Sequence, residues 1–245
     1  MDNRLKKINI RNGFFGLSLN QALTNHQDHH CYVLKAGSHH QIDTLPLSLQ
    51  NRHLYIICED LTNPAVITGH FSLEDCVITL KNINLHGQVN NPDMPIILAT
   101  NTQVGLTNST ISGLGSCIAI KATGNSQIQL DDCRFSDFKG SFEDDQPACG
   151  LMLEAQTEAI LTNLTFNRYN ETLGIVAGDD ARVQLNGGKF DSFEKSIAIG
   201  LDDQASAALS DLTFEQINTD AIYMKGGLVK LSNCTLHSAK QSHNL

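Results

Sequence analysis

The chain has 245 residues, and its 26 acidic and 17 basic side chains give a formal net charge of −9 at pH 7. The sequence contains neither a basic stripe nor a basic cluster, so nucleic acid and anionic membranes are disfavoured as partners. No apolar stretch near the start is long enough for a signal peptide or a membrane span. We therefore expect a cytoplasmic protein, or one exported by a leaderless route.

The first predicted element is a short helix. Ser18 and Gln21 fit a capping box, in which each side chain binds a backbone N–H group of the first helical turn. We expect the helix to run to about Asn25 and assign residues 1–30 to an N-terminal cap segment. Residues 31–245 are expected to form one domain, because no linker rich in Pro, Gly or Ser interrupts the pattern that follows.

A repeat begins near residue 80. Seven leucines open the same short pattern at spacings of 22 to 31 residues: Leu80, Leu106, Leu130, Leu161, Leu185, Leu209 and Leu231. An Asn, Asp or Gly comes two residues after each leucine, and a Leu, Ile or Phe comes five residues after it. A fixed period of this length indicates stacked units that share one core.

Within each unit, apolar residues alternate with polar ones, as in residues 183–185 and 197–199, which predicts short strands. About 24 residues with three such strands fit one coil of a right-handed parallel β-helix. We therefore predict an all-β solenoid of about eight coils. Phe135, Phe166, Phe190 and Phe214 are expected to stack inside it, and Asn82, Asn108 and Asn163 to share one turn column.

The seven cysteines are predicted to be reduced. Cys133 and Cys234 occupy a repeat position that Ile83 and Leu164 also occupy, so they are expected to act as small core residues. Free core thiols favour a reducing compartment.

The Leu-x-Asn-x-x-Phe pattern and the segment Val33–Ser38 resemble coils of the pectin-lyase-like right-handed β-helix superfamily. The resemblance covers nearly the whole chain and implies that the helix near residues 18–25 plugs the N-terminal end. Asn218–Asp220 and Gly178–Asp180 are similar to polygalacturonase motifs, but they occur in the wrong order. No specific enzyme family is matched.

One repeat step is longer than the others. The 31 residues from Leu130 to Leu161 include about seven extra residues near positions 140–148. Glu143, Asp144 and Asp145 in this insertion could supply oxygen ligands to a calcium ion. The alternative is a solvated acidic loop.

An outward stripe of charged residues crosses the later repeats: Arg134, Asp137, Arg168, Lys189, Asp191 and Glu215. Asp191 and Glu215 lie one coil apart, so they are candidates for paired acid/base catalysis on a glycoside. The other four are candidates for substrate binding. The alternative is the polar exterior that any soluble β-helix requires.

Histidines cluster early in the chain. His29, His30 and Cys31, with His39 or His40, are a second candidate for metal binding, here of a transition metal. Neighbouring residues on a strand point in opposite directions, which weakens this assignment.

The main functional prediction is a non-catalytic β-helical module that presents a rigid face to a glycan or protein partner. It is expected to be a monomer, or a homo-oligomer joined end to end or face to face. One alternative is a carbohydrate-active enzyme, either a polysaccharide lyase or a glycoside hydrolase. The other is a leaderless bacterial effector or assembly factor.

Overall fold

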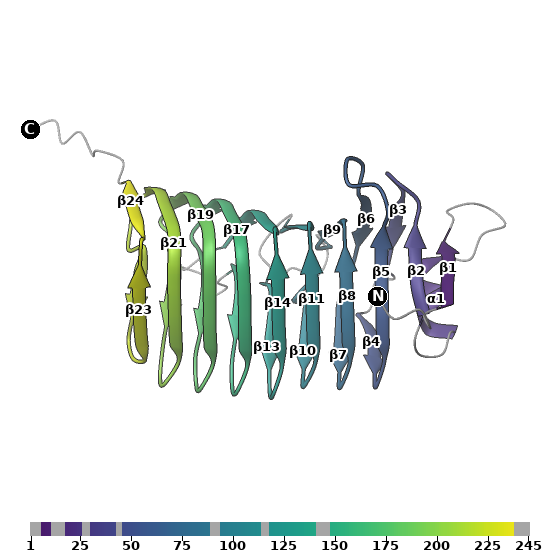
Figure 1. Cartoon of the computed structure of the whole chain (residues 1–245), viewed down its shortest axis with the longest axis horizontal. Helices are drawn as coiled ribbons and strands as arrows, with labels where there is room; N and C mark the ends of the chain where they lie inside the picture. The colour runs from purple at the N-terminus through teal and green to yellow at the C-terminus, as the bar shows by residue number, and fades with distance from the viewer. Residues whose placement is uncertain are drawn as a thin grey trace, which may run out of the picture.

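The computed structural model describes residues 6–10, 18–25, 30–42, 46–88, 94–113, 118–140 and 148–237. The described strands wind into a parallel β-solenoid, in which successive coils lie side by side along one axis (Figure 1). Every strand pair is parallel, and each coil contributes one strand to an eight-stranded sheet. The predicted all-β solenoid of about eight coils is therefore confirmed.

The sixteen-stranded sheet bends into two walls. The first wall consists of β1 (Lys6–Ile10), β2 (His30–Leu34), β5 (His53–Cys58), β8 (Val77–Lys81), β11 (Gln103–Thr107), β14 (Gln127–Asp131), the first halves of β17 (Glu158–Asn170), β19 (Arg182–Glu194) and β21 (Ser206–Ile217), and β23 (Leu228–Ser232).

The second wall continues each coil after a bend. It consists of β3 (His39–Gln41), β6 (Ala65–Thr68), β9 (Ile83–His86), β12 (Thr110–Ser112), β15 (Arg134–Lys139), the second halves of β17, β19 and β21, and β24 (Thr235–His237). The eight-stranded sheet forms the third wall, with β4 (Leu47–Gln50), β7 (Phe71–Glu74), β10 (Ile97–Thr100), β13 (Ile118–Thr123), β16 (Ala148–Leu153), β18 (Thr172–Ala177), β20 (Ile197–Leu201) and β22 (Ile222–Met224).

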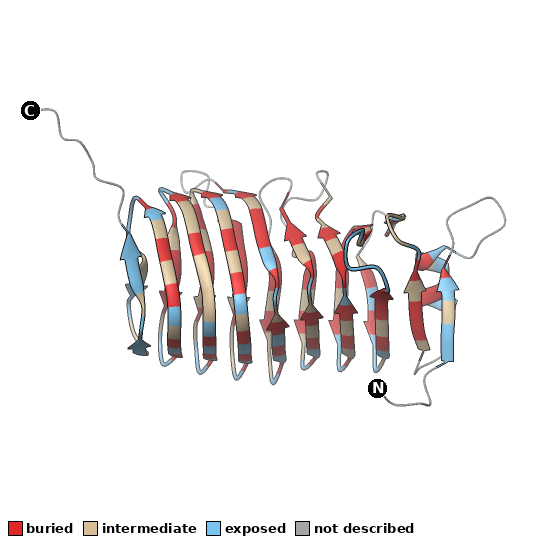
Figure 2. Cartoon of the chain, turned by 45° about the horizontal axis from the view of Figure 1, so that its top comes forward, coloured by how far each residue is buried: buried red, intermediate tan, exposed pale blue. Residues whose placement is uncertain are grey.

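The core follows the predicted repeat. All seven leucines of the repeat lie in one register, and the first six are buried, at 2% exposure or less. The predicted phenylalanine column is also confirmed, because Phe135, Phe166, Phe190 and Phe214 are buried and stack with ring centroids 4.7–5.1 Å apart. Burial alternates along most strands, which gives the banded ribbons of Figure 2.

The bend between the first two walls is set by one residue per coil in left-handed conformation. Asn82, Asn108 and Asn163 have φ of 56°, 48° and 52°, as the shared turn column predicts. Short polar side chains and glycine tolerate this geometry best. The side-chain amide of Asn82 also donates to the carbonyl of Cys58 in the preceding coil at 2.7 Å, which ties the two turns together.

Helix α1 (Leu19–Asn25) occurs where the capping box predicts it. The Ser18 hydroxyl accepts from the N–H of Gln21 at 3.2 Å, and the Gln21 side chain accepts from the N–H of Ser18 at 3.4 Å. Leu19, Ala22 and Leu23 are buried in the core near β2. In the described part of the chain, no helix is long and apolar enough to cross a membrane.

Six cysteines lie among the described residues, and all six are free thiols. Cys133 is buried, as its repeat position predicts, and burial raises the pKa of its thiol to about 11. Burial also raises the pKa of Cys149. Cys234 is only partly buried, because it lies in the last described coil.

Candidate functional site

The outward stripe lies on the second wall, where β15, β17, β19 and β21 run side by side. Asn167, Asp191 and Glu215 occupy one outward column in direct register. Arg134 and Lys189 occupy the neighbouring column, two coils apart. Like positions of adjacent coils lie about 4.8 Å apart, so the stripe forms a continuous polar surface.

Lys189 joins the two candidate catalytic carboxylates. Its ammonium Nζ is 2.8 Å from Oε2 of Glu215 and 3.3 Å from Oδ2 of Asp191. The hydrogen bond to Glu215, followed by that to Asp191, raises the pKa of Lys189 above its usual value. The structure therefore brings these three predicted residues into contact, with the lysine binding both carboxylates.

Arg168 and Asp137 form a second charged pair on the stripe. The guanidinium Nη2 of Arg168 donates to Oδ2 of Asp137 at 2.7 Å, and its Nε donates to Oδ1 of Asn167 at 3.1 Å. Asp137 and Arg168 both have positive φ, 63° and 61°, and such a residue changes the direction of its strand. We call this column the bent column.

Ser192 and Gln216 continue this bent column, with φ of 59° and 51°, although the sequence prediction omits them. The Ser192 hydroxyl donates to Oδ1 of Asp191 at 3.1 Å, which links the bent column to the carboxylate column. Both residues follow their repeat leucine by seven positions, as Asp137 and Arg168 do. Extending that register through all coils would have found them.

A concavity of about 680 Å³ borders the stripe. Its lining includes Arg168, Ser192 and Gln216 from the bent column, together with Asn218 beyond β21. Asp191 and Glu215 do not line it, although Ser192 and Gln216, which follow them directly in the chain, do. Arg134 has no ion-pair partner among the described residues and lies outside this concavity.

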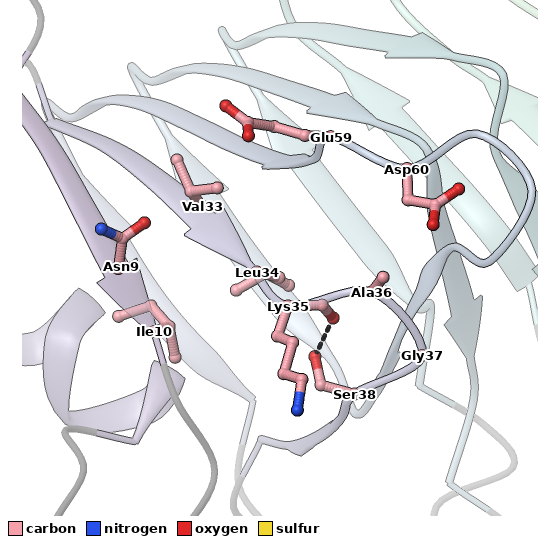
Figure 3. Close-up of a pocket in the computed structure, with 10 residues that line it drawn as sticks. All are labelled: Asn9, Ile10, Val33, Leu34, Lys35, Ala36, Gly37, Ser38, Glu59 and Asp60. Atoms are coloured by element: carbon pink, nitrogen blue, oxygen red, sulfur yellow. Dashed lines mark hydrogen bonds between the residues drawn. The ribbon is translucent and has the colours of Figure 1, made fainter.

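A larger concavity of about 850 Å³ lies at the opposite end of the solenoid, between β1, β2 and the turn after β5 (Figure 3). Both of its carboxylates and the Ser38 hydroxyl already have partners within the protein. Glu59 binds Lys7 at 3.2 Å, and Asp60 accepts from the backbone and hydroxyl of Thr62, which lowers the pKa of Asp60. The Ser38 hydroxyl donates to the carbonyl of Lys35. We therefore do not regard this concavity as the main site.

A third concavity, of about 760 Å³, follows the turns between the third and first walls. Amide side chains from successive coils line it, including those of Asn125, Gln156 and Gln204, and Glu158 and Arg182 form an exposed ion pair at 3.6 Å on its border. Glu158 and Asp180 also line this groove, but among the described residues no cation joins these two carboxylates as Lys189 joins those of Asp191 and Glu215.

The two predicted metal sites gain no support. Glu143, Asp144 and Asp145, proposed as calcium ligands, lie outside the described residues, as does His29. Across the part of the chain that the structure describes, no group of three or more His, Cys, Asp or Glu side chains is arranged to hold a metal ion. His39 is exposed and His40 is buried, so they point in opposite directions, and burial lowers the pKa of His40.

Comparison with known proteins found one matching family and similar solved structures. The sequence matches no curated protein. Two solved structures are each 11% identical to this chain, with a TM-score of 0.40. The first is a putative glycosyl hydrolase from Parabacteroides merdae, and the match covers 82% of this chain and 98% of that chain. The second is the catalytic domain of a GH87 α-1,3-glucanase in complex with tetrasaccharides, and the match covers 96% of this chain and 59% of that chain. Likeness at this level assigns no activity.

The family described as the right-handed beta helix region matches residues 95–242, which is more than half of the chain. This range includes the outward stripe and six of the seven repeat leucines. The match confirms the predicted handedness and the resemblance to the pectin-lyase-like superfamily. The chain belongs to the right-handed β-helix family.

Proposed function

We propose that the outward stripe binds a glycan and that the protein is a carbohydrate-active β-helix protein. The observation that carries this proposal is the polar network on β15, β17, β19 and β21, in which charged and amide groups from adjacent coils bind one another. Sugar hydroxyls both donate and accept hydrogen bonds, so they need donors and acceptors held at fixed positions. A β-helix wall supplies them on a rigid surface.

The charges of the stripe favour a neutral glycan over a polyuronate. Its six residues comprise three cations and three carboxylates. Arg168 and Lys189 already bind carboxylates of the protein, so a uronate would have to compete with these internal partners. The hydroxyl groups of a neutral glycan can instead hydrogen-bond to the solvent-facing atoms of these ion pairs without separating the paired charges. We therefore expect neutral polysaccharides to bind best.

Replacing both carboxylates of the stripe should weaken glycan binding at least tenfold. The change is Asp191→Asn with Glu215→Gln, which removes two charged acceptors and leaves Lys189 without its partners. A glycan array would identify the strongest neutral ligand, and isothermal titration calorimetry would give its affinity for each protein.

The matched control changes another exposed ion pair, Glu158→Gln with Arg182→Gln, at the border of the 760 Å³ groove. It removes the same kind of surface charge away from the stripe, so glycan affinity should not change. Equal affinities for the two double variants, with thermal melting unchanged, would reject the stripe as the binding site.

The direct register of Asp191 with Glu215 favours glycoside hydrolysis as a second candidate function. Two carboxylates on adjacent coils can divide the work of hydrolysis. One, when protonated, gives its proton to the glycosidic oxygen, and the other accepts a proton from water or attacks the anomeric carbon. Because Lys189 binds both carboxylates, the bound glycan would have to displace it from the one that acts as the acid.

Hydrolysis predicts that the single change Asp191→Asn lowers turnover at least 100-fold while glycan binding persists. Release of reducing ends from the bound polysaccharide measures turnover, and calorimetry measures binding on the same samples. If the unchanged protein binds glycan but releases no reducing ends, hydrolysis is wrong, and the stripe fits the non-catalytic module that the sequence predicts.

A further inference from the structure

In the part of the chain that the structure describes, the coil formed by β22, β23 and β24 is the last, and its apolar side chains are exposed. Leu231 and Leu236 continue the columns of Leu209 and Phe214, yet they are 56% and 59% exposed where the preceding pair is 2% and 3% exposed. Other large apolar side chains of this coil are about half exposed: Tyr223, Met224 and Leu228. Figure 2 shows the pale-blue strands at this end. A contiguous apolar patch of this kind on a protein surface marks an interaction site.

Among the described residues, the backbone at this end also has no strand partner on its outer side. β22 pairs only with β20, while β23 and β24 pair only with β21. A surface that covers the exposed leucines must therefore also present strand edges, because buried N–H and C=O groups need hydrogen-bond partners. A helix or a flat apolar surface would leave these groups unpaired. The end of another β-solenoid meets both needs.

The opposite end of the solenoid is closed to such a contact. Leu19 and Leu23 of α1 are buried in the core at this end, and the Tyr32 hydroxyl donates to the carbonyl of Ala22 at 3.3 Å. The β22–β24 end of one copy therefore cannot stack on the α1 end of the next copy. The arrangement that remains is a symmetric contact between two β22–β24 ends.

The charge of the uncovered coil permits this symmetric contact. Residues 221–237 contain Lys225 and Lys230 but no Asp or Glu, although the whole chain has a net charge of −9. Lys225 is 3.4 Å from Oδ2 of Asp202 in the preceding coil, which offsets its charge. Two copies that meet here therefore bring no carboxylates of these coils against each other, whereas a contact between acidic walls would be repulsive.

We propose that the β22–β24 end binds the same end of a second copy of this chain. The two copies are related by a twofold axis perpendicular to the solenoid, so their edge strands meet antiparallel and the exposed leucines become the centre of the interface. This isologous contact is complete with two copies. The inference is independent of glycan binding, because the stripe and the end surface share no residue.

Sedimentation velocity of the 245-residue chain at tens of micromolar tests the proposal. The expected species has twice the 26.8 kDa mass of one chain. The double variant Leu231→Glu with Leu236→Glu should sediment as a monomer, because the twofold axis brings the new carboxylates together. Both side chains are already exposed in the single chain, so circular dichroism should show an unchanged fold.

The matched control is Ile160→Glu, which places the same charge on an apolar side chain that is 56% exposed on the first wall. This variant should remain a dimer. The proposal is wrong if the unchanged chain is monomeric at this concentration or forms masses larger than two chains. It is also wrong if the double variant stays dimeric, or if Ile160→Glu dissociates the dimer equally.

Discussion

Replacing Phe190 with Ala should lower the free energy of unfolding by about 3–5 kcal/mol. Phe190 is fully buried in the middle of the phenylalanine column, with its ring centroid 4.7 Å from that of Phe166 and 5.1 Å from that of Phe214. Alanine would leave a cavity, because the rings above and below are held by their own coils and cannot close it. Equilibrium unfolding in guanidinium chloride, followed by circular dichroism, gives the change.

The control is Ile160→Ala on the outside of β17, which should cost less than about 0.5 kcal/mol because this side chain is already mostly in solvent. Two independent probes should follow the unfolding, because stacked coils can unfold separately. A loss below about 1 kcal/mol for Phe190→Ala would show that the column is not tightly packed.

Replacing Gly188 with Ala should destabilise the protein by about 3 kcal/mol or more. Gly188 has φ of 145°, a conformation that is essentially restricted to glycine. A methyl group there would lie 2.4 Å from the backbone oxygen of Leu164 in the preceding coil, so two coils would have to separate. Because Lys189 follows directly, the variant should also weaken glycan binding if it folds.

Gly105→Ala is the opposite case and serves as the control. This glycine lies in β11, and a methyl group would be 3.6 Å from the nearest atom, Oγ1 of Thr79. Alanine restricts the unfolded chain without strain there, so the free energy of unfolding should rise by about 0.4–1 kcal/mol. Denaturant unfolding of the two variants should therefore give changes of opposite sign. Equal changes would contradict the strain assigned to Gly188.

The sequence predicts the columns of this fold well because stacking copies each repeat position onto the next coil. The leucine and phenylalanine columns and the Asn turn column follow from counting residues, and so does the register of Asp191 with Glu215. The short helix follows from local capping chemistry at Ser18 and Gln21. These features depend on backbone geometry that every coil shares.

Features that depend on side-chain direction are harder to predict. The sequence places Lys189 on the stripe, but the choice of both Asp191 and Glu215 as partners depends on rotamers and on the width of the wall. The bent column of Asp137 and Arg168 depends on a left-handed residue inside a strand, a conformation that is uncommon for an arginine. Leu231 is exposed because its coil is the last of the described ones, and the repeat pattern gives Leu231 the same position as the buried leucines.

The long repeat step leaves the columns intact. Leu130 pairs directly with Leu161 and Phe135 with Phe166, although the chain between the two leucines is about seven residues longer than in the neighbouring steps. The corner between β15 and β16 can therefore gain or lose residues without shifting any strand. In evolutionary terms, the walls and this corner can diversify separately, so new specificities can arise by lengthening one turn while the scaffold sequence stays constant. The same corner is a suitable position for grafting a foreign peptide in protein engineering.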